Sequence, residues 1–230
     1  MGIKERQERD REAVRRGILD AARELFVTEG YANVSIRKIA ERIEYSPAAI
    51  YSYFPSKDDI FFALAEEGFR LLSDPGRPAA EPASRSPLEC LRSMLWRLYE
   101  FSRDYPQYFS LMFVDRQVPK ITREYERFAF TRNLKLRAAE QIQACVDAGL
   151  FPAHVNPMAA LRVLTVGVLG VAAMRDRLSP NEDADAVAAD VLDVAIAGLR
   201  AGTALRSSGP PLNCPADADE TQAPQRPAER

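Results

Sequence analysis

Apolar residues recur every three or four positions in nearly every segment of this chain, which is the spacing of an amphipathic helix. The first such segment places Val14, Ile18, Ala22 and Phe26 on one face and ends at Gly30. No run of alternating apolar residues between turns predicts a strand. The pattern therefore predicts an all-α protein with about nine helices.

Several helix starts are marked by a hydroxyl or amide side chain that can cap the free amides of a first turn. Ser35 predicts one short helix, and Ser46-Pro47 predicts a second that runs to about Phe54. Residues 56–73 open with a capping box and predict a longer fourth helix. Together these helices form the predicted N-terminal domain, residues 1–73.

The remaining chain divides into a linker, a second helical domain and a tail. Residues 74–86 are rich in proline and small residues and predict a linker. The C-terminal domain, predicted over 87–206, comprises a helix after Ser86-Pro87, a short aromatic helix between Pro106 and Pro119, and further helices over 121–148, 157–174 and 183–200. Prolines and few apolar residues over 207–230 predict a disordered tail.

Residues 35–57 pair two short helices across a tight turn, an arrangement typical of a helix-turn-helix. The second helix opens on small and hydroxylated side chains, which allow its backbone to approach a DNA major groove closely. Apolar spacing buries the inner faces and leaves outward Ser46, Pro47, Ala48, Ala49, Tyr51, Ser52 and Tyr53. From the pattern alone, the alternative is an ordinary helical hairpin with surface tyrosines.

Specific motifs occur across residues 18–64. They are A-x-x-L-F-x-x-x-G-Y from Ala22 to Tyr31, then Ser35-Ile36 with Ile39-Ala40, and I-Y-x-Y-F-x-S-K from Ile50 to Lys57. In these residues the chain resembles the N-terminal domain of TetR-type transcriptional regulators. The rest is similar to that family only in the number and layout of its helices. The resemblance implies a three-helix helix-turn-helix domain followed by a helical bundle for effector binding and dimerisation.

The resemblance also implies roles for individual side chains. Phosphate contacts fall to Ser35, Tyr51, Tyr53 and Lys57, and charge and position add Arg37 and Lys38. Base reading falls to Pro47, Ala48 and Ser52, with Ala49 placed to touch a thymine methyl. For Tyr51 the alternative is a core aromatic residue.

The chain departs from the family in the turn between the two short helices. Where the family usually has glycine and then a small aliphatic residue, this sequence has Glu44 and Tyr45. A carboxylate that faced the duplex would repel phosphate. In the alternative arrangement, Glu44 lies away from DNA and Tyr45 fills the space under the turn.

Two further sites are expected in the C-terminal domain. Aromatic and polar residues of the middle helices are candidates for an effector pocket: Trp96, Tyr99, Phe109, Met112, Phe113, Arg116, Tyr125, Phe128 and Arg132. For each aromatic residue the alternative is simple core packing. Apolar residues of the last two helices are candidates for a homodimer interface: Leu161, Leu164, Val168, Val171, Val187, Val191 and Val194. Here the alternative is burial inside one subunit.

Composition narrows the classes of function. The 31 basic and 33 acidic residues give a formal net charge of -2, so DNA contact must come from a local patch. Residues 1–16 combine six basic with four acidic side chains, which favours a solvated helical extension over a DNA-seeking arm. One histidine and three widely spaced cysteines provide no recognisable metal site, disulfide framework or catalytic relay. We therefore expect no cofactor and no enzyme activity.

The N-terminus lacks the apolar stretch of a signal peptide, and the apolar segment 158–174 is shorter than a membrane span. The sequence thus predicts a soluble, cytoplasmic protein without a membrane partner. We expect a transcriptional regulator, most simply a repressor, that binds a near-palindromic operator as a dimer and is released by a small apolar or amphipathic effector. The alternative is a helical small-molecule-binding or protein-interaction protein that does not bind DNA.

Overall fold

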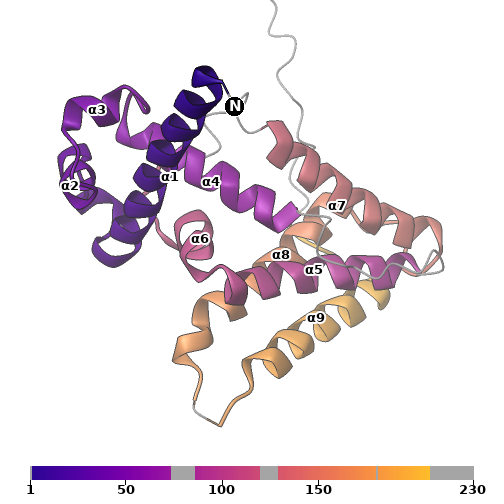
Figure 1. Cartoon of the computed structure of the whole chain (residues 1–230). Coiled ribbons are helices and arrows are strands. Elements are labelled where there is room, and N and C mark those ends of the chain that lie inside the picture. Colours follow the sequence, from indigo (N-terminus) through magenta and orange to yellow (C-terminus); the bar gives the residue numbers. More distant parts are fainter. Residues whose placement is uncertain (1, 74–85, 120–128, 180, 208–230) are drawn as a thin grey trace, which may run out of the picture.

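The computed structural model describes residues 2–73, 86–119, 129–179 and 181–207 (Figure 1). Within these ranges every regular element is a helix, which confirms the predicted all-α class. Helices α1–α4 gather at one end of the molecule, and α5, α7, α8 and α9 form a bundle at the other. The short helix α6 lies between the two groups.

The N-terminal helices begin and end where local signals predict. Helix α1 (Ile3–Glu29) ends at Gly30, whose φ of 82° reverses the chain as only glycine does freely. A short turn of 3-10 helix, η1 (Tyr31–Asn33), connects it to α2 (Ile36–Arg42). Helices α3 (Pro47–Tyr51) and α4 (Lys57–Ser73) follow. Helix α3 ends at Tyr51, three residues before the predicted Phe54, although the amides of Tyr53 and Phe54 still donate to the Ile50 carbonyl.

The C-terminal helices also begin at the expected caps. Ser86 and Glu89 form a reciprocal capping box at α5 (Pro87–Asp104), and Asn156 caps α8 (Pro157–Met174). Between them lie α6 (Pro106–Phe109), a π-helical turn η2 (Ser110–Val114) and α7 (Ala129–Asp147). A 3-10 turn, η4 (Arg175–Arg177), follows α8, and α9 (Ala184–Arg200) completes the bundle.

Buried side chains form two cores, one at each end of the molecule. The N-terminal core joins α1–α4, with Ile18, Phe26, Ile39, Ile50 and Phe61 almost fully buried. The C-terminal core joins α5, α7, α8 and α9. Side chains of α5, α6 and η2, including Phe101, Tyr108, Phe109 and Leu111, belong to the N-terminal core. The two ends are therefore joined by packing as well as by the chain.

Parts of three predicted segments lie outside the described residues. They are residues 74–85 of the linker, residues 121–128 of the helix predicted over 121–148, and residues 208–230 of the tail. Cys214 lies there too, while Cys90 and Cys145 are free thiols. The effect of burial raises the pKa of the Cys145 thiol, with a smaller contribution from Cys90, which suits a structural residue. No cluster of three or more metal-ligating side chains occurs in the described ranges.

The segment Pro157–Arg177, which contains α8, is long and apolar enough to cross a membrane by length and composition alone. Core helices of water-soluble proteins have the same length and composition. This helix packs against α5, α7 and α9, with Leu164 and Val168 buried among them. That packing agrees with the core helix that the sequence predicts.

Candidate nucleic-acid interface

The second helix of the helix-turn-helix, α3, lies on the surface with its apolar side buried. Ile50 is fully buried, whereas Ala48, Tyr51 and Ser52 are exposed. The Ser46 hydroxyl accepts a hydrogen bond from the Ala49 amide at 3.2 Å and so holds the first turn. The exposed face thus consists of small side chains around one tyrosine.

The placement of Tyr51 excludes the core alternative, because 54% of its surface is exposed. Pro47 is exposed, Ala49 and Tyr53 are half-buried, and the Ser52 hydroxyl donates to the Ala49 carbonyl at 2.7 Å. The helix therefore presents shape and an aromatic hydroxyl more than long hydrogen-bonding side chains. Such a surface offers close approach and apolar contact more than hydrogen bonds to base edges.

The turn before α3 contains an unusual backbone conformation. Glu44 has a φ of 59°, in the left-handed region that glycine adopts without strain. Both Glu44 and Tyr45 are exposed, so the prediction that Tyr45 fills the space under the turn is wrong. The Tyr45 amide instead donates to the Ala40 carbonyl at 2.9 Å, and this backbone bond closes the turn.

The basic side chains of α2 are each held by a carboxylate. Arg37 pairs with Glu41 at 2.9 Å, Lys38 with Glu29 of α1, and Arg42 with Glu24 of α1. Ser35 caps the helix by accepting from the Lys38 amide at 3.2 Å. Its hydroxyl proton stays available to donate to an anion at this helix N-terminus.

Lys57, at the start of α4, is engaged inside the domain. Its ammonium donates to the carbonyls of Tyr31 (2.8 Å) and Val34 (2.9 Å) and lies 4.1 Å from the centre of the Tyr31 ring. The effect of burial lowers the pKa of the Lys57 ammonium, opposed by the neighbouring Asp58. Lys57 therefore ties the entry of α2 to α4, and a single N–H remains for a phosphate.

Among the described residues, those predicted for an effector pocket lie in different surroundings. Tyr125 and Phe128 lie outside the described residues. Tyr99 is fully buried with its hydroxyl on Asp185 (2.8 Å), and Phe109 belongs to the N-terminal core. Arg116 is exposed. The other four residues are partly buried: Trp96, Met112, Phe113 and Arg132.

A cavity of about 350 Å³ lies instead between α4 and α7. It is lined by Glu66, Phe69, Arg70, Ser73, Asn133, Leu134 and Arg137. Phe69 also packs edge-on against Phe113 of η2, with ring centres 6.2 Å apart. The cavity thus contacts the helix that leaves the N-terminal domain.

The predicted dimer residues fall into two groups. Leu161, Leu164 and Val168 are buried in the core of their own chain, so the interface prediction needs correction for these three. Val171, Val187 and Val191 are half-buried, and Val194 is 73% exposed.

On α8 the large apolar side chains that are exposed are Val163, Val166 and Met174. A Cβ on Gly167 would lie 2.9 Å from Val191, so this glycine brings α8 and α9 together within one chain.

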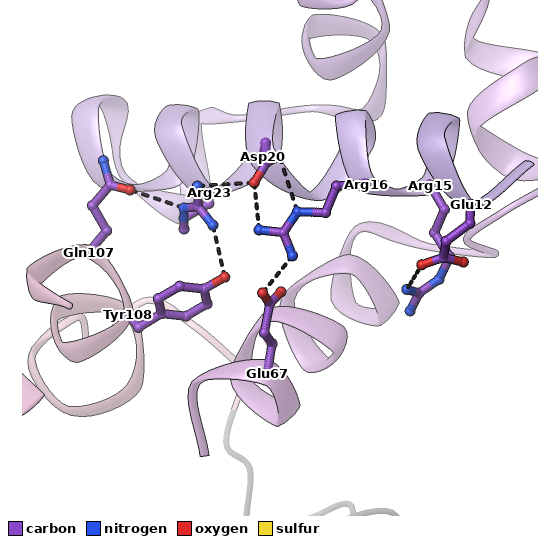
Figure 2. Close-up of polar contacts among 8 residues, drawn as sticks. All are labelled: Glu12, Arg15, Arg16, Asp20, Arg23, Glu67, Gln107 and Tyr108. Atoms are coloured by element: carbon purple, nitrogen blue, oxygen red, sulfur yellow. Dashed lines mark hydrogen bonds and ion pairs between the residues drawn. The ribbon is translucent and has the colours of Figure 1, made fainter. Parts of the chain in front are cut away.

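Polar contacts join the N-terminal domain to α6 (Figure 2). Arg23 of α1 donates to Tyr108 Oη (2.8 Å) and to Gln107 Oε1 (3.0 Å). Arg16 pairs with Asp20 and with Glu67 of α4, and these carboxylates raise the pKa of its guanidinium. Nothing in the sequence indicated these contacts, because Arg23 and Tyr108 are 85 positions apart along the chain.

Comparison with known proteins identifies this N-terminal domain. Residues 18–64 match the family described as "Bacterial regulatory proteins, tetR family". An 83-residue stretch is 39% identical to the HTH-type transcriptional repressor Rv1474c of Mycobacterium tuberculosis, covering 36% of this chain and 41% of that protein. The repressor AcnR of Corynebacterium diphtheriae is 35% identical over 81 residues, 35% of this chain and 40% of that protein.

The match to these curated relatives spans only about two-fifths of their length. A solved structure extends the similarity along the chain. The crystal structure of a transcriptional regulator of the TetR/AcrR family from Thermobifida fusca is 26% identical, with a TM-score of 0.54 over 81% of this chain and 98% of that one. The segment 18–64 therefore matches the DNA-binding part of the tetR family of bacterial regulatory proteins, and the fold of the longer chain is similar to that of a TetR/AcrR-family regulator.

Proposed function

We propose that this protein is a transcriptional repressor that binds a near-palindromic operator as a homodimer in the bacterial cytoplasm. The observation that carries the proposal is the exposed face of α3, in which Ala48, Tyr51 and Ser52 face outward while Ile50 is buried in the core. A helix with so little side-chain bulk can lie deep in the major groove.

Dimerisation is supported by an outward apolar face on the last two long helices. Val163, Val166, Gly170 and Met174 recur at helical spacing along one side of α8, and Val194 lies on α9. Such a face suits a symmetric four-helix contact with a second copy. Two α3 helices related by a two-fold axis then read two half-sites about one helical turn, or a multiple of it, apart.

Release by an effector is supported by the cavity between α4 and α7. Phe69 and Leu134 provide apolar walls, and Asn133, Arg70 and Arg137 provide polar groups, which suits a small amphipathic molecule. Because α4 also belongs to the N-terminal core, occupancy of this cavity can change the position of α3. No catalytic chemistry is part of the proposal.

The test is selection of bound duplexes from a random-sequence pool, followed by gel-shift titration of the recovered sequences. The wild type is expected to enrich one near-palindromic motif. Tyr51→Ala should lose the shift, while Tyr105→Ala, which removes an exposed tyrosine between α5 and α6, outside the helix-turn-helix, should retain it. Recovery of no common sequence, or equal binding by both variants, would overturn the proposed function.

A further inference from the structure

Positive charge beside the recognition helix α3 does not come mainly from the helix-turn-helix itself. The three basic residues of α2 are each paired with a carboxylate, and Lys57 is held by two backbone carbonyls. These contacts reduce the charge that the motif presents to a phosphate. Among the described residues, basic side chains beside α3 that have no ion pair therefore lie on a neighbouring element.

That element is the N-terminal half of α1. The first residue of α1 that packs against the core is Val14, which is partly buried. The helix starts at Ile3, so its first turns extend beyond the core. Lys4, Arg11 and Arg15 are spaced by seven and four residues and therefore share one side of the helix. Ile18 and Ala22 continue the same side into the core. The three cations thus form a stripe, the α1 stripe, that prolongs the face on which the domain packs.

The α1 stripe lies against the end of the recognition segment. The Arg15 guanidinium is 5.4 Å from the centre of the Phe54 ring, and Arg11 is 5.8 Å from the centre of the Tyr53 ring. Tyr53 is one of the side chains to which the tetR resemblance assigns a phosphate contact. Arg11 therefore lies at the border of the proposed DNA surface.

The charges of the stripe are only partly compensated. Among the described residues neither Lys4 nor Arg11 has an ion pair, and Arg15 pairs with Glu12 at 3.5 Å across an exposed turn (Figure 2). Between residues 4 and 15, two carboxylates, Glu8 and Glu12, lie beside the three cations of the stripe. Exposed cations without partners, next to an aromatic hydroxyl, are the groups that bind backbone phosphates.

We propose that Lys4, Arg11 and Arg15 of α1 form a second DNA contact, to backbone phosphates that flank the stretch read by α3. The proposal rests on the proposed DNA-binding function and adds a surface outside the helix-turn-helix. The stripe spans twelve residues, or about 16 Å of helix, which reaches several phosphates beyond the groove contact. Its role is affinity and operator length, because phosphate contacts carry no base sequence.

The experiment compares two variants with the same change of charge. Lys4→Gln/Arg11→Gln removes two cations of the stripe, and Arg6→Gln/Arg9→Gln removes two cations from the opposite side of the same exposed helical segment. Glutamine keeps the helix propensity similar to that of lysine and arginine. Equal thermal unfolding of the two variants establishes that both remain folded.

Binding is titrated over a range of salt concentrations with duplexes recovered by selection with the wild type, bearing flanks of increasing length. The stripe variant should bind about tenfold more weakly at low salt, and its salt slope should fall by about 0.9 for each phosphate that it no longer binds. Longer flanks, which strengthen binding by the wild type, should give this variant no added affinity. The control variant should follow the wild type in all three measurements.

Two failures are distinguishable. If the wild type shows no salt-dependent DNA binding, the proposed function fails and this contact fails with it. If the wild type binds DNA but the two variants show the same decrease in affinity and slope, the effect is one of net charge. In that case the α1 contact is overturned while the proposed function stands.

Discussion

At the scale of single residues, Glu44 has a strained backbone in the turn of the helix-turn-helix. The helix-turn-helix needs a left-handed residue here, and glutamate adopts that conformation at a cost of about 1–2 kcal/mol relative to glycine. Backbone strain of this kind at a functional turn is compatible with a role for the side chain in the site.

We predict that Glu44→Gly raises the free energy of unfolding by about 0.5–1 kcal/mol, because relief of strain outweighs the added freedom of glycine in the unfolded chain. Chemical denaturation measures the change. Glu44→Ala removes the charge and keeps the strain, so it should give no gain in stability. A gain equal to that of the glycine variant would assign the effect to the carboxylate.

Lys57 contributes to the candidate DNA-binding site by holding the backbone that precedes α2. The two carbonyls that it binds precede α2, so its ammonium determines where the helix-turn-helix begins relative to α4. Tyr31, which stacks under the ammonium, donates to Asp58. The effect of burial, with this contact, raises the pKa of the Tyr31 phenol.

We predict that Lys57→Met lowers the free energy of unfolding by about 2 kcal/mol, since two charge-assisted hydrogen bonds disappear and their acceptors stay unpaired. Thermal or chemical denaturation provides the measurement. Lys135→Met, an exposed position on α7, serves as the control and should change little. Unchanged stability in Lys57→Met would mean that this lysine acts only as a phosphate ligand.

At the scale of elements, α4 and α6 connect the two ends of the molecule. Gly68 of α4 lies against α6 and η2 so closely that a Cβ would lie 3.1 Å from Tyr108 Cδ1 and closer still to Met112. Arg23 of α1 binds the other side of Tyr108 through its hydroxyl. Helix α6 is therefore held between the helix that starts the DNA-binding domain and the helix that ends it.

We predict that Arg23→Gln loosens the docking of α6, because it removes the hydrogen bond to Tyr108 and the ion pair to Asp20. Amide hydrogen exchange in α6 and η2 should accelerate by about tenfold, while exchange in α9 stays as in the wild type. Arg42→Gln breaks an exposed pair with Glu24 that does not reach α6 and is the matched control. Equal exchange in α6 for both variants would show that apolar packing alone holds it.

At the scale of the whole molecule, the described parts of α8 and α9 each leave apolar side chains exposed. Val166 is 62% exposed and Val194 73% exposed, although both lie on helices whose opposite sides are buried. Helices α8 and α9, which carry these side chains, lie away from the end that carries α3 (Figure 1). A second copy bound there leaves both recognition helices free.

We predict that Val166→Asp yields a monomer, because a buried unpaired carboxylate at the contact costs about 3 kcal/mol or more. Sedimentation or light scattering measures the mass, and operator affinity should fall in parallel as the two half-sites are no longer read together. Leu136→Asp places the same charge at an exposed apolar position of α7 and should leave the dimer intact. If Val166→Asp stays dimeric, the interface lies elsewhere.

Interactions between residues close together along the chain determined where several helices begin and which fold class the protein has. The starts of α2, α3, α5 and α8 follow from Ser35, Ser46, Ser86 and Asn156, because a cap needs only a side chain and the amides two or three residues ahead of it. Helical spacing predicted the all-α class, and motifs within 47 adjacent residues predicted the tetR family that the comparison with residues 18–64 supports. These features depend on neighbours along the chain.

The tertiary structure alone decided which surfaces remain free. Helix α8 is apolar on nearly every side, so the sequence did not show that Leu164 faces its own core and Val166 faces outward. The pairing of Lys38 with Glu29, and of Arg23 with Tyr108, joins separate helices whose relative placement no local pattern encodes. Charge neutralisation, close helix approach and burial depend on packing between distant segments, and for that physical reason only the folded chain reveals them.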